Sequence, residues 1–317
     1  MTQPAAQIRS GSIYQDVFTK RIDNAPVTVM AELECAQIVD GRLHFADHDR
    51  AIHALRDGVF LLERPAGLNL EAGDEFAKQF HLGPEVTPYG KFRDVTSAML
   101  GDPLLGFHQR SDQIEQFLLE RRLWEHFPVE VAALGEAFTT AAAIILAEAL
   151  ELVGLPAELR ELATGGSLTK QGSYHLTFNH YRDALPGVGL SSHKDDGFVT
   201  LLRVVRPGLE VNRRDRWETV PVSPDHLVVN FGLSMELLTA RCPVAVSAIM
   251  HRVCHQDSDR WSYGHFTSSR CDPGSDGGIF AFAPPDQLEP ICSSRDLIDA
   301  NDAEIYRGTV PQETPND

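Results

Sequence analysis

The spacing of hydrophobic positions differs between the two halves of the chain and changes near residue 165. Before that residue, apolar side chains recur every three or four positions in several segments, as they do on one face of a helix. A short apolar run between two of these segments is typical of a buried strand. The elements expected in this part are an arm or strand over 1–25, helices over 48–56 and 71–81, and a strand over 58–62.

A much longer helix is expected over residues 128–152. Alanine and leucine dominate this stretch, and both residues favour helix. Pro128 is typical of the start of a helix, and Gly154 together with Pro156 ends the segment. We interpret this helix as a scaffold that packs against a sheet.

After residue 165, short β-rich runs follow one another, separated by proline, glycine, aspartate and asparagine. Many short strands at this spacing predict an antiparallel sandwich or barrel. The expected strands are 174–181, 199–205, 217–222, 227–230, 244–250 and 261–268. The predicted fold class is therefore mainly β with flanking helices.

The length of the chain, 317 residues, is enough to bury a sizeable core in one large fold unit. We expect two parts within that unit. Residues 1–100 form an N-terminal region of helices and strands. Residues 101–317 form the β domain, which includes the scaffold helix at 128–153.

The charge of the chain argues against a nucleic-acid partner. There are 45 acidic and 28 basic residues, which gives a formal net charge of −17. Binding to a phosphate backbone needs clustered lysine and arginine, and the sequence has no such cluster. We expect the acidic surface to keep the protein soluble and its partner to be a small molecule. The sequence does not fix the oligomeric state, and a monomer is compatible with it.

Cysteine usage and hydropathy favour a cytoplasmic protein. The five cysteines are odd in number and include no Cys-x-x-Cys pair, so reduced thiols fit better than a disulfide framework or a zinc ribbon. The first 30 residues lack the pattern of a signal peptide. The most apolar stretch, 138–147, is too short to cross a bilayer. We therefore expect no membrane association.

The residues that suggest chemistry are His193, Asp195 and His251. Residues two apart on a strand point to the same face, so His193 and Asp195 can offer an imidazole and a carboxylate to one metal ion. His251 lies at the end of another β-rich run. Two histidines and one carboxylate on one side of a metal form the facial triad of non-haem iron(II) oxygenases, which leaves three coordination positions open.

The His-x-Asp spacing alone is a weak signal, because His255 and Asp257 match it as well. His255 also lies four residues after His251, which in a helix would suggest a zinc pair, although the β-rich context argues against that reading. The triad gains support from a downstream pair, Arg260 and Ser262, which share a face on a strand. Arginine binds a carboxylate through two hydrogen bonds, and the serine hydroxyl can donate a third.

With these residues in place, the chain resembles the isopenicillin N synthase-like family of 2-oxoglutarate- and iron(II)-dependent dioxygenases over residues 179–267. The family likeness implies a double-stranded β-helix, or jelly roll, with the metal at one open end. It implies iron(II) bound by His193, Asp195 and His251, with 2-oxoglutarate and O2 as co-substrates. It also implies that Arg260 and Ser262 hold the 2-oxoglutarate carboxylate. The matching residues are Asn179, His180 and Tyr181, then His193, Asp195, Gly197, Thr200, Gly208, Val211, Trp217, Val220, Asn230, Gly232, His251, Val253, Arg260 and Ser262.

Two further residues receive roles from the resemblance, and three positions depart from it. Tyr181 and Asn179 are expected to donate supporting hydrogen bonds to the co-substrate. The family usually has aspartate where this chain has Leu233 and proline where it has Arg182, and the segment 239–243 is longer than the usual turn. These departures concern loops near the substrate more than the iron ligands.

The resemblance implies that the enzyme oxidises a small molecule, most simply by hydroxylating an unactivated C–H bond in specialised metabolism of a bacterium. Because Asp195 supplies a carboxylate, no coordination position is left for a halide, and halogenation is disfavoured. An iron(II) oxidase that desaturates or closes a ring without 2-oxoglutarate is the alternative enzyme. A metal- or ligand-binding β-sandwich without turnover is the alternative from another class.

Substrate contacts are less defined by the sequence. Residues 89–93 and 107–111 are polar and aromatic segments that correspond to regions near the substrate in the resembling family, and solvated loops are the alternative interpretation. The segment after Cys271 is a candidate cover for the pocket, although no pattern in it fixes that position.

Overall fold

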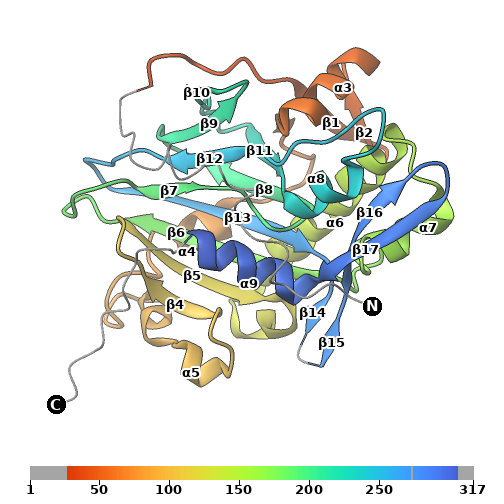
Figure 1. Ribbon diagram of the computed structural model, residues 1–317. Helices are drawn as coiled ribbons and strands as arrows, with labels where there is room; N and C mark the ends of the chain where they lie inside the picture. The colour runs from red at the N-terminus through yellow and green to blue at the C-terminus, as the bar shows by residue number, and fades with distance from the viewer. Residues whose placement is uncertain (1–26, 273, 306–317) are drawn as a thin grey trace.

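The structure is a computed structural model that describes residues 27–272 and 274–305 (Figure 1). Residues 1–25, for which an arm or strand is expected, lie outside the described residues. Two β-sheets face each other, one of nine strands and one of four. The described helices are α3 (His48–Asp57), α4 (Glu71–Ala77), α5 (Ser97–Leu100), α6 (Val129–Leu152), α7 (Ala157–Ala163), α8 (Leu233–Thr239) and α9 (Ser294–Ile305), with 3-10 turns η2 (Gly90–Asp94) and η3 (Arg121–His126).

The two sheets form the predicted jelly-roll core, and their strands pair antiparallel except for β1 with β3. The larger sheet has the order β2 (Arg42–Phe45), β1 (Cys35–Val39), β3 (Val59–Glu63), β11 (His226–Phe231), β8 (Val199–Val204), β13 (Arg260–Ser268), β6 (Ser173–Tyr181), β5 (Ile114–Glu120), β4 (Gly106–Gln109). The smaller sheet has the order β10 (Arg216–Thr219), β9 (Leu209–Arg213), β12 (Met250–Val253), β7 (Leu190–His193). The predicted fold class, mainly β with flanking helices, is confirmed.

Alternation along the central strands divides their side chains between two environments. On β6 and β13, Phe178 and Tyr263 point to the helical side and are fully buried there. Tyr181 points between the two sheets, in a separate cluster that includes Val204 and Val253. Because successive residues of a strand face opposite ways, the polar residues next to Phe178 and Tyr263 also face the smaller sheet. The space between the sheets is therefore lined partly by polar side chains.

The helical side of the larger sheet is an aromatic core. Phe76 of α4 is at its centre, with its ring centroid 4.5 Å from that of Phe178 and 4.8 Å from that of Phe92. Phe117 of β5 and Phe80 complete the group, and both are fully buried. These rings fix α4 and the turn that follows it against the outer face of β5 and β6.

The long helix α6 packs on the same side and confirms the predicted scaffold. By length and composition it could cross a membrane, with 24 residues and a mean hydropathy of 1.7, which the expectation from residues 138–147 alone did not anticipate. Half of the 18-residue apolar stretch within this helix is buried inside the protein. Val131, Phe138 and Ile145 are fully buried against the sheet and α4. An apolar helix of this kind is typical of a core element.

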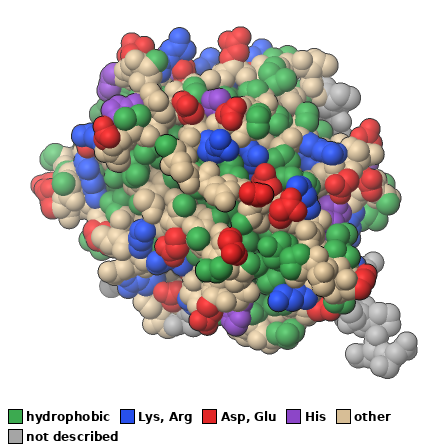
Figure 2. All heavy atoms as spheres, turned by 180° about the vertical axis from the view of Figure 1, so that it is seen from behind, with side chains coloured by type: hydrophobic (Ala, Val, Ile, Leu, Met, Phe, Trp, Pro, Cys, Tyr) green, Lys and Arg blue, Asp and Glu red, His purple; other side chains and the backbone are tan. Residues whose placement is uncertain are grey.

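The last part of the chain adds two hairpins and a helix around the sandwich. They are β14 (Cys271–Asp272) with β15 (Ser275–Asp276), and β16 (Gly278–Ala283) with β17 (Gln287–Ser293). Helix α9 follows directly and lies beside β7 (Figure 1). Acidic and basic side chains are intermixed on the opposite face of the molecule (Figure 2).

One predicted strand is wrong, and several elements were not predicted. Residues 244–249 form no strand: Val246 N–H donates to the Thr239 hydroxyl, whereas Ser247 and Ile249 N–H donate to carbonyls of Leu55 and Phe231. β-Branched residues alone therefore did not produce a ladder. The unpredicted elements include β4, β5, β9, α8 and α9, and helix α4 ends before residue 81.

Gly58 provides a test of the junction between α3 and β3. It ends α3 in the left-handed region, with φ of 75°, and a Cβ there would lie 2.3 Å from the Ser247 carbonyl oxygen. Gly101 ends α5 with φ of 68° and has open space around it. Gly101→Ala should lower the free energy of unfolding by about 1–2 kcal/mol through the left-handed backbone alone. Gly58→Ala should lower it by about 1–3 kcal/mol more, because the 247–249 segment must also move.

Urea denaturation of the two alanine variants and the parent chain measures these differences. Equal decreases in the free energy of unfolding for Gly58→Ala and Gly101→Ala would show that the Ser247 carbonyl does not lie close to Gly58 in solution.

Candidate metal centre

The structure brings His193, Asp195 and His251 together between the two sheets. His193 ends β7 and is the direct cross-strand partner of His251 on β12. One ligand atom from each of the three residues lies within 4.8 Å of the others. Asp195 Oδ1 is 3.8 Å from His193 Nε2 and 3.7 Å from His251 Nε2. Asp195 and His251 are buried, and His193 is half-buried.

The expected arrangement of His193 and Asp195 on one strand needs correction. β7 stops at His193, and Asp195 lies in the loop that follows. The Asp195 carbonyl accepts a hydrogen bond from Leu233 N–H at 2.8 Å, which ties this loop to the start of α8. Gly232 makes the approach possible, because a Cβ there would lie 2.8 Å from the same carbonyl oxygen. The carboxylate reaches the histidines through this loop and not through strand alternation.

Hydrogen bonds orient each of the three side chains toward the others. The backbone carbonyls of Ser191 and Ile249 accept from Nδ1 of His193 and His251 at 2.8 and 3.2 Å, which leaves both Nε2 atoms available as ligands. The Thr200 hydroxyl donates to Asp195 Oδ2 at 2.7 Å and leaves Oδ1 available. Burial, reinforced by the neighbouring imidazole, lowers the pKa of His193 to about 3, so its Nε2 lone pair is free at neutral pH. The donor set fits a divalent metal ion.

The second His-x-Asp match does not take part. His255 is exposed, and its Nδ1 contacts the Gly187 carbonyl. It is absent from the group of possible metal ligands around His251, and β12 is a strand, so the zinc pair of the alternative interpretation does not form.

Arg260, Ser262, Tyr181 and Asn179 meet in a small cavity of about 70 Å³ beside the three candidate ligands. The pairing of β13 with β6 places Arg260 opposite Tyr181 and Ser262 opposite Asn179. Arg260 is 1% exposed, and its guanidinium lies 4.4 Å from the centre of the Tyr181 ring. Its Nε donates to the Pro207 carbonyl at 3.2 Å, but Nη1 is buried and has no hydrogen-bond partner.

This cavity fits an anion. A buried charged donor without a partner costs about 1–3 kcal/mol or more, and a carboxylate would satisfy it. The candidate metal ligands line the same cavity, so a molecule with two coordinating ends could bridge the guanidinium and a metal ion. Asn179 is already engaged, since its Oδ1 accepts from Gln116 Nε2 at 2.8 Å.

Comparison with known proteins agrees with this geometry. Residues 173–269 match the model of the 2OG-Fe(II) oxygenase superfamily. This segment is therefore similar to 2OG-Fe(II) oxygenases. It contains the three candidate metal ligands and Arg260, Ser262, Tyr181 and Asn179, and the predicted family resemblance is confirmed.

The curated sequence relatives match only part of this chain. Gibberellin 3-beta-dioxygenase 2-2 of Triticum aestivum is 41% identical over 88 residues, 26% of this chain and 23% of that protein. 1-Aminocyclopropane-1-carboxylate oxidase homolog 10 of Arabidopsis thaliana is 35% identical over 129 residues, 40% of this chain and 32% of that protein. The chain therefore spans about a quarter to a third of the length of these curated relatives.

Solved structures extend the likeness of the fold to almost the whole chain. JOX2 in complex with 2OG, Fe and JA superposes with a TM-score of 0.67, at 19% identity, over 96% of this chain and 98% of that one. Dioxygenase for auxin oxidation 1 from Arabidopsis thaliana gives a TM-score of 0.59, at 17% identity, over 76% and 94%. The strands and helices outside residues 173–269 thus follow the same fold.

A second cavity of about 170 Å³ opens on the other side of the candidate ligands. It shares Gln116, His193, Asp195 and Phe266 with the first cavity, so the two meet at the possible metal position. We call the cavity that contains Arg260 the inner cavity and this one the outer cavity. Its other lining residues are Leu104, Arg110, Leu118, His175, Thr177, Lys194, Asp196, Ser268, Ile298, Asn301 and Asp302.

The two segments expected near a substrate have different positions. Arg110, from the segment 107–111, lines the outer cavity. Arg182, one of the departures from the family pattern, supports this segment by donating to the Arg110 and Asp112 carbonyls. In the segment 89–93, Lys91 and Phe92 line a separate cavity under η2 that contains none of the candidate ligands.

Gln116 on β5 and three residues of α9 were not predicted from the sequence. The short apolar run over 117–119 is the signal that could have identified β5. Helix α9 places Ile298, Asn301 and Asp302 at the outer cavity. The segment after Cys271 therefore does border the pocket, as considered from the sequence.

Another histidine–carboxylate group lies on the helical side of the larger sheet. His81 stacks on His180 with ring centroids 3.5 Å apart and nearly parallel planes. Both nitrogens of His180 already contact carboxylates, those of Glu115 and Asp259. Stacked imidazoles direct their lone pairs along parallel lines, so this group does not fit a metal ion as the oxygenase triad does.

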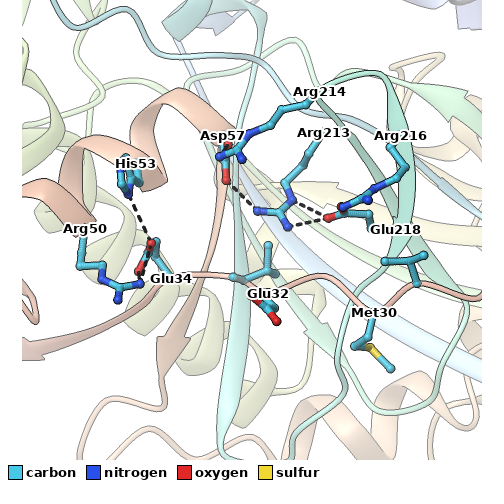
Figure 3. Close-up of a pocket in the computed structure, with 12 residues that line it drawn as sticks. Met30, Glu32, Glu34, Arg50, His53, Asp57, Arg213, Arg214, Arg216 and Glu218 are labelled. Carbon is cyan, nitrogen blue, oxygen red and sulfur yellow. Dashed lines mark hydrogen bonds and ion pairs between the residues drawn. The ribbon is translucent and has the colours of Figure 1, made fainter.

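A further cavity, of about 660 Å³, is drawn in Figure 3, and none of the three candidate ligands lines it. It lies between α3 and the β9–β10 hairpin. Arg213 spans this region and forms ion pairs with Asp57 and Glu218. None of its lining residues borders the inner or outer cavity. We interpret the ion pairs that line this cavity as a network that connects the N-terminal region to the smaller sheet.

Metal binding tests the assignment of the three ligands. The parent chain should bind one iron(II) ion, and His251→Ala should lose it because one of the three converging ligand atoms is removed. His255→Ala is the matched control, since it removes an exposed histidine four residues away. Metal analysis after anaerobic loading and desalting measures the retained iron. Retention by His251→Ala together with loss in His255→Ala would identify His255 as the ligand instead.

Proposed function

We propose that this protein is a 2-oxoglutarate- and iron(II)-dependent dioxygenase that hydroxylates a C–H bond of a small molecule. The observation that carries the proposal is the buried, unpartnered Nη1 of Arg260 on one side of a two-histidine, one-carboxylate cluster. A dicarboxylate with a metal-chelating end satisfies both features at once. The similarity of the segment 173–269 to the superfamily supports the same conclusion.

His193, Asp195 and His251 would hold the iron(II) ion and leave one side of it open. Iron(II), 2-oxoglutarate and O2 together supply the oxidising power, which the protein directs toward one substrate bond. Arg260 binds the distal carboxylate of the co-substrate, with the Ser262 hydroxyl beside it. Tyr181 supports the guanidinium through the face of its ring.

The remaining residues of the chain position these groups. Thr200 keeps one carboxylate oxygen of Asp195 turned away from the metal position, and the Ser191 and Ile249 carbonyls keep both imidazoles in the tautomer that coordinates through Nε2. The inner cavity is lined by Leu202, Val204 and other apolar side chains that limit the access of water to the co-substrate.

The outer cavity supports a small-molecule substrate. Its volume of about 170 Å³ and its position beside His193 and Asp195 suit a compact molecule presented to the metal. Related folds have been solved with JA and with thymine bound. We further propose that the protein acts in specialised metabolism in a bacterial cytoplasm. The free state of all five cysteines supports that compartment.

Arg260→Ala should weaken 2-oxoglutarate binding by at least about tenfold, since a hydrogen bond to a charged group contributes about 1.5–3 kcal/mol. Ser262→Ala removes one hydroxyl and should have a smaller effect. Iron binding should survive both substitutions, because neither residue is a ligand. The measurement is an anaerobic titration of the iron(II) protein with 2-oxoglutarate, followed by the metal-to-ligand charge-transfer absorption. An unchanged dissociation constant in Arg260→Ala would remove Arg260 from the co-substrate site.

Turnover separates the proposal from its alternatives. Incubation of the parent chain with iron(II), 2-oxoglutarate and O2 should release succinate, slowly without substrate, and Asp195→Ala should release none. Mass spectrometry of succinate provides the readout. Normal iron binding with no charge-transfer absorption and no succinate would instead favour the iron(II) oxidase. Iron and 2-oxoglutarate binding without succinate, even with a wide set of substrates, would favour the non-catalytic binding protein.

A further inference from the structure

The acidic and basic side chains that line the outer cavity differ in how far other residues already neutralise their charge. Lys194 is fully engaged, since its ammonium group lies 3.0 Å from both carboxylate oxygens of Glu236. Arg110 donates from Nε to Gln116 Oε1. Asp196 and Asp302 enter the cavity from two sides, one from the loop after β7 and the other from α9.

The surroundings of Asp196 are acidic. Asp195, Asp196 and Asp302 all line the outer cavity. Burial raises the pKa of Asp302, and the guanidinium groups of Arg110 and Arg295 only partly offset this effect. Asp195 faces the metal position, so the cavity itself keeps two carboxylates against the single guanidinium of Arg110.

Asn301 adds an independent indication of a ligand. The residue is 4% exposed and lines the same cavity as the two carboxylates. Its Nδ2 donates to the Lys194 carbonyl at 3.1 Å, which fixes the orientation of the amide. Its Oδ1 is buried and has no hydrogen-bond partner. A buried acceptor of this kind is costly unless a donor reaches it.

We propose that the substrate of this site is a small primary amine, which binds in its ammonium form to Asp302, Asp196 and the Oδ1 atom of Asn301. The proposal rests on the proposed function and specifies its substrate class. An ammonium group brings three N–H donors and one positive charge, which match the acceptors and the unbalanced charge of the cavity. An anionic substrate would instead place its charge beside two carboxylates and would have to displace the contacts of Arg110.

The apolar part of the cavity defines the rest of the molecule. Leu104, Leu118 and Ile298 form apolar walls, and Phe266 borders both the inner and the outer cavity. A compact hydrocarbon body anchored at α9 would therefore extend past Phe266 toward His193 and Asp195. The bond to be oxidised lies on this body and away from the ammonium group.

Binding of three matched probes tests the proposal without turnover. Cyclohexylmethylamine, cyclohexylmethanol and cyclohexanecarboxylate have similar bodies and carry a positive, a neutral and a negative group. Isothermal titration of each probe into the anaerobic iron(II) protein saturated with 2-oxoglutarate should give an affinity for the amine at least about tenfold above the other two. Equal affinities, tighter binding of the carboxylate, or no detectable binding of the amine would overturn the proposal.

Variants on α9 locate the recognition. Asp302→Asn should weaken amine binding by about tenfold, and Asp302→Glu should retain most of it because the charge remains. Asp299→Asn is the matched control, since it removes the same charge from an exposed position on the same helix. Unchanged amine affinity in Asp302→Asn would overturn the proposal, because the amine would then bind elsewhere, for example directly at the metal.

Failure of this inference can be distinguished from failure of the proposed function. The charge-transfer absorption recorded before each probe is added reports iron(II) and 2-oxoglutarate binding independently of the outer cavity. If that absorption forms and the carboxylate probe binds best, only the substrate class is wrong. If the absorption never forms, the proposed function fails first, and the amine recognised by this site is not the substrate of a 2-oxoglutarate-dependent enzyme.

Discussion

The pairing of β12 with β7 is the constraint on which the site depends. It places His251 directly across from His193, and a register irregularity follows immediately between His251 and Val253. A shift of one residue would turn either imidazole to the other face of the sheet. The loop after β7 then needs to bring only one carboxylate, that of Asp195, to two imidazoles that the sheet has already placed.

The second requirement is that the fold accommodates buried polar side chains between the two sheets. Arg260 is held there by long antiparallel pairing, because β13 lies between β6 and β8 and pairs with both. The aromatic core on the other face of these strands supplies the burial that stabilises them. The unpartnered Nη1 of Arg260 and Oδ1 of Asn301 therefore lower the stability of the fold locally, and the well-packed scaffold compensates for this loss. Each atom lies where a ligand would satisfy it.

The sequence predicted the fold class and the three candidate metal ligands, because both depend on local signals. Period-two alternation and turn residues identify strands such as β6 and β13, and the family pattern identifies His193, Asp195 and His251. The expected strand over 244–250 failed because its N–H groups find separate tertiary partners, which no local pattern reveals. Gln116 and α9 were missed for a similar reason: their place at the outer cavity results from packing between distant segments.

The central claim is that one metal ion and one dicarboxylate occupy the two sides of this cluster. An anaerobic crystal structure with iron(II) and 2-oxoglutarate, with the anomalous scattering of iron recorded, tests it most directly. The account predicts one anomalous peak, bound by Nε2 of His193 and His251 and a carboxylate oxygen of Asp195, with the distal carboxylate on Arg260. An iron peak at His255 or at the stacked pair of His81 and His180, or a 2-oxoglutarate carboxylate bound away from Arg260, would contradict it.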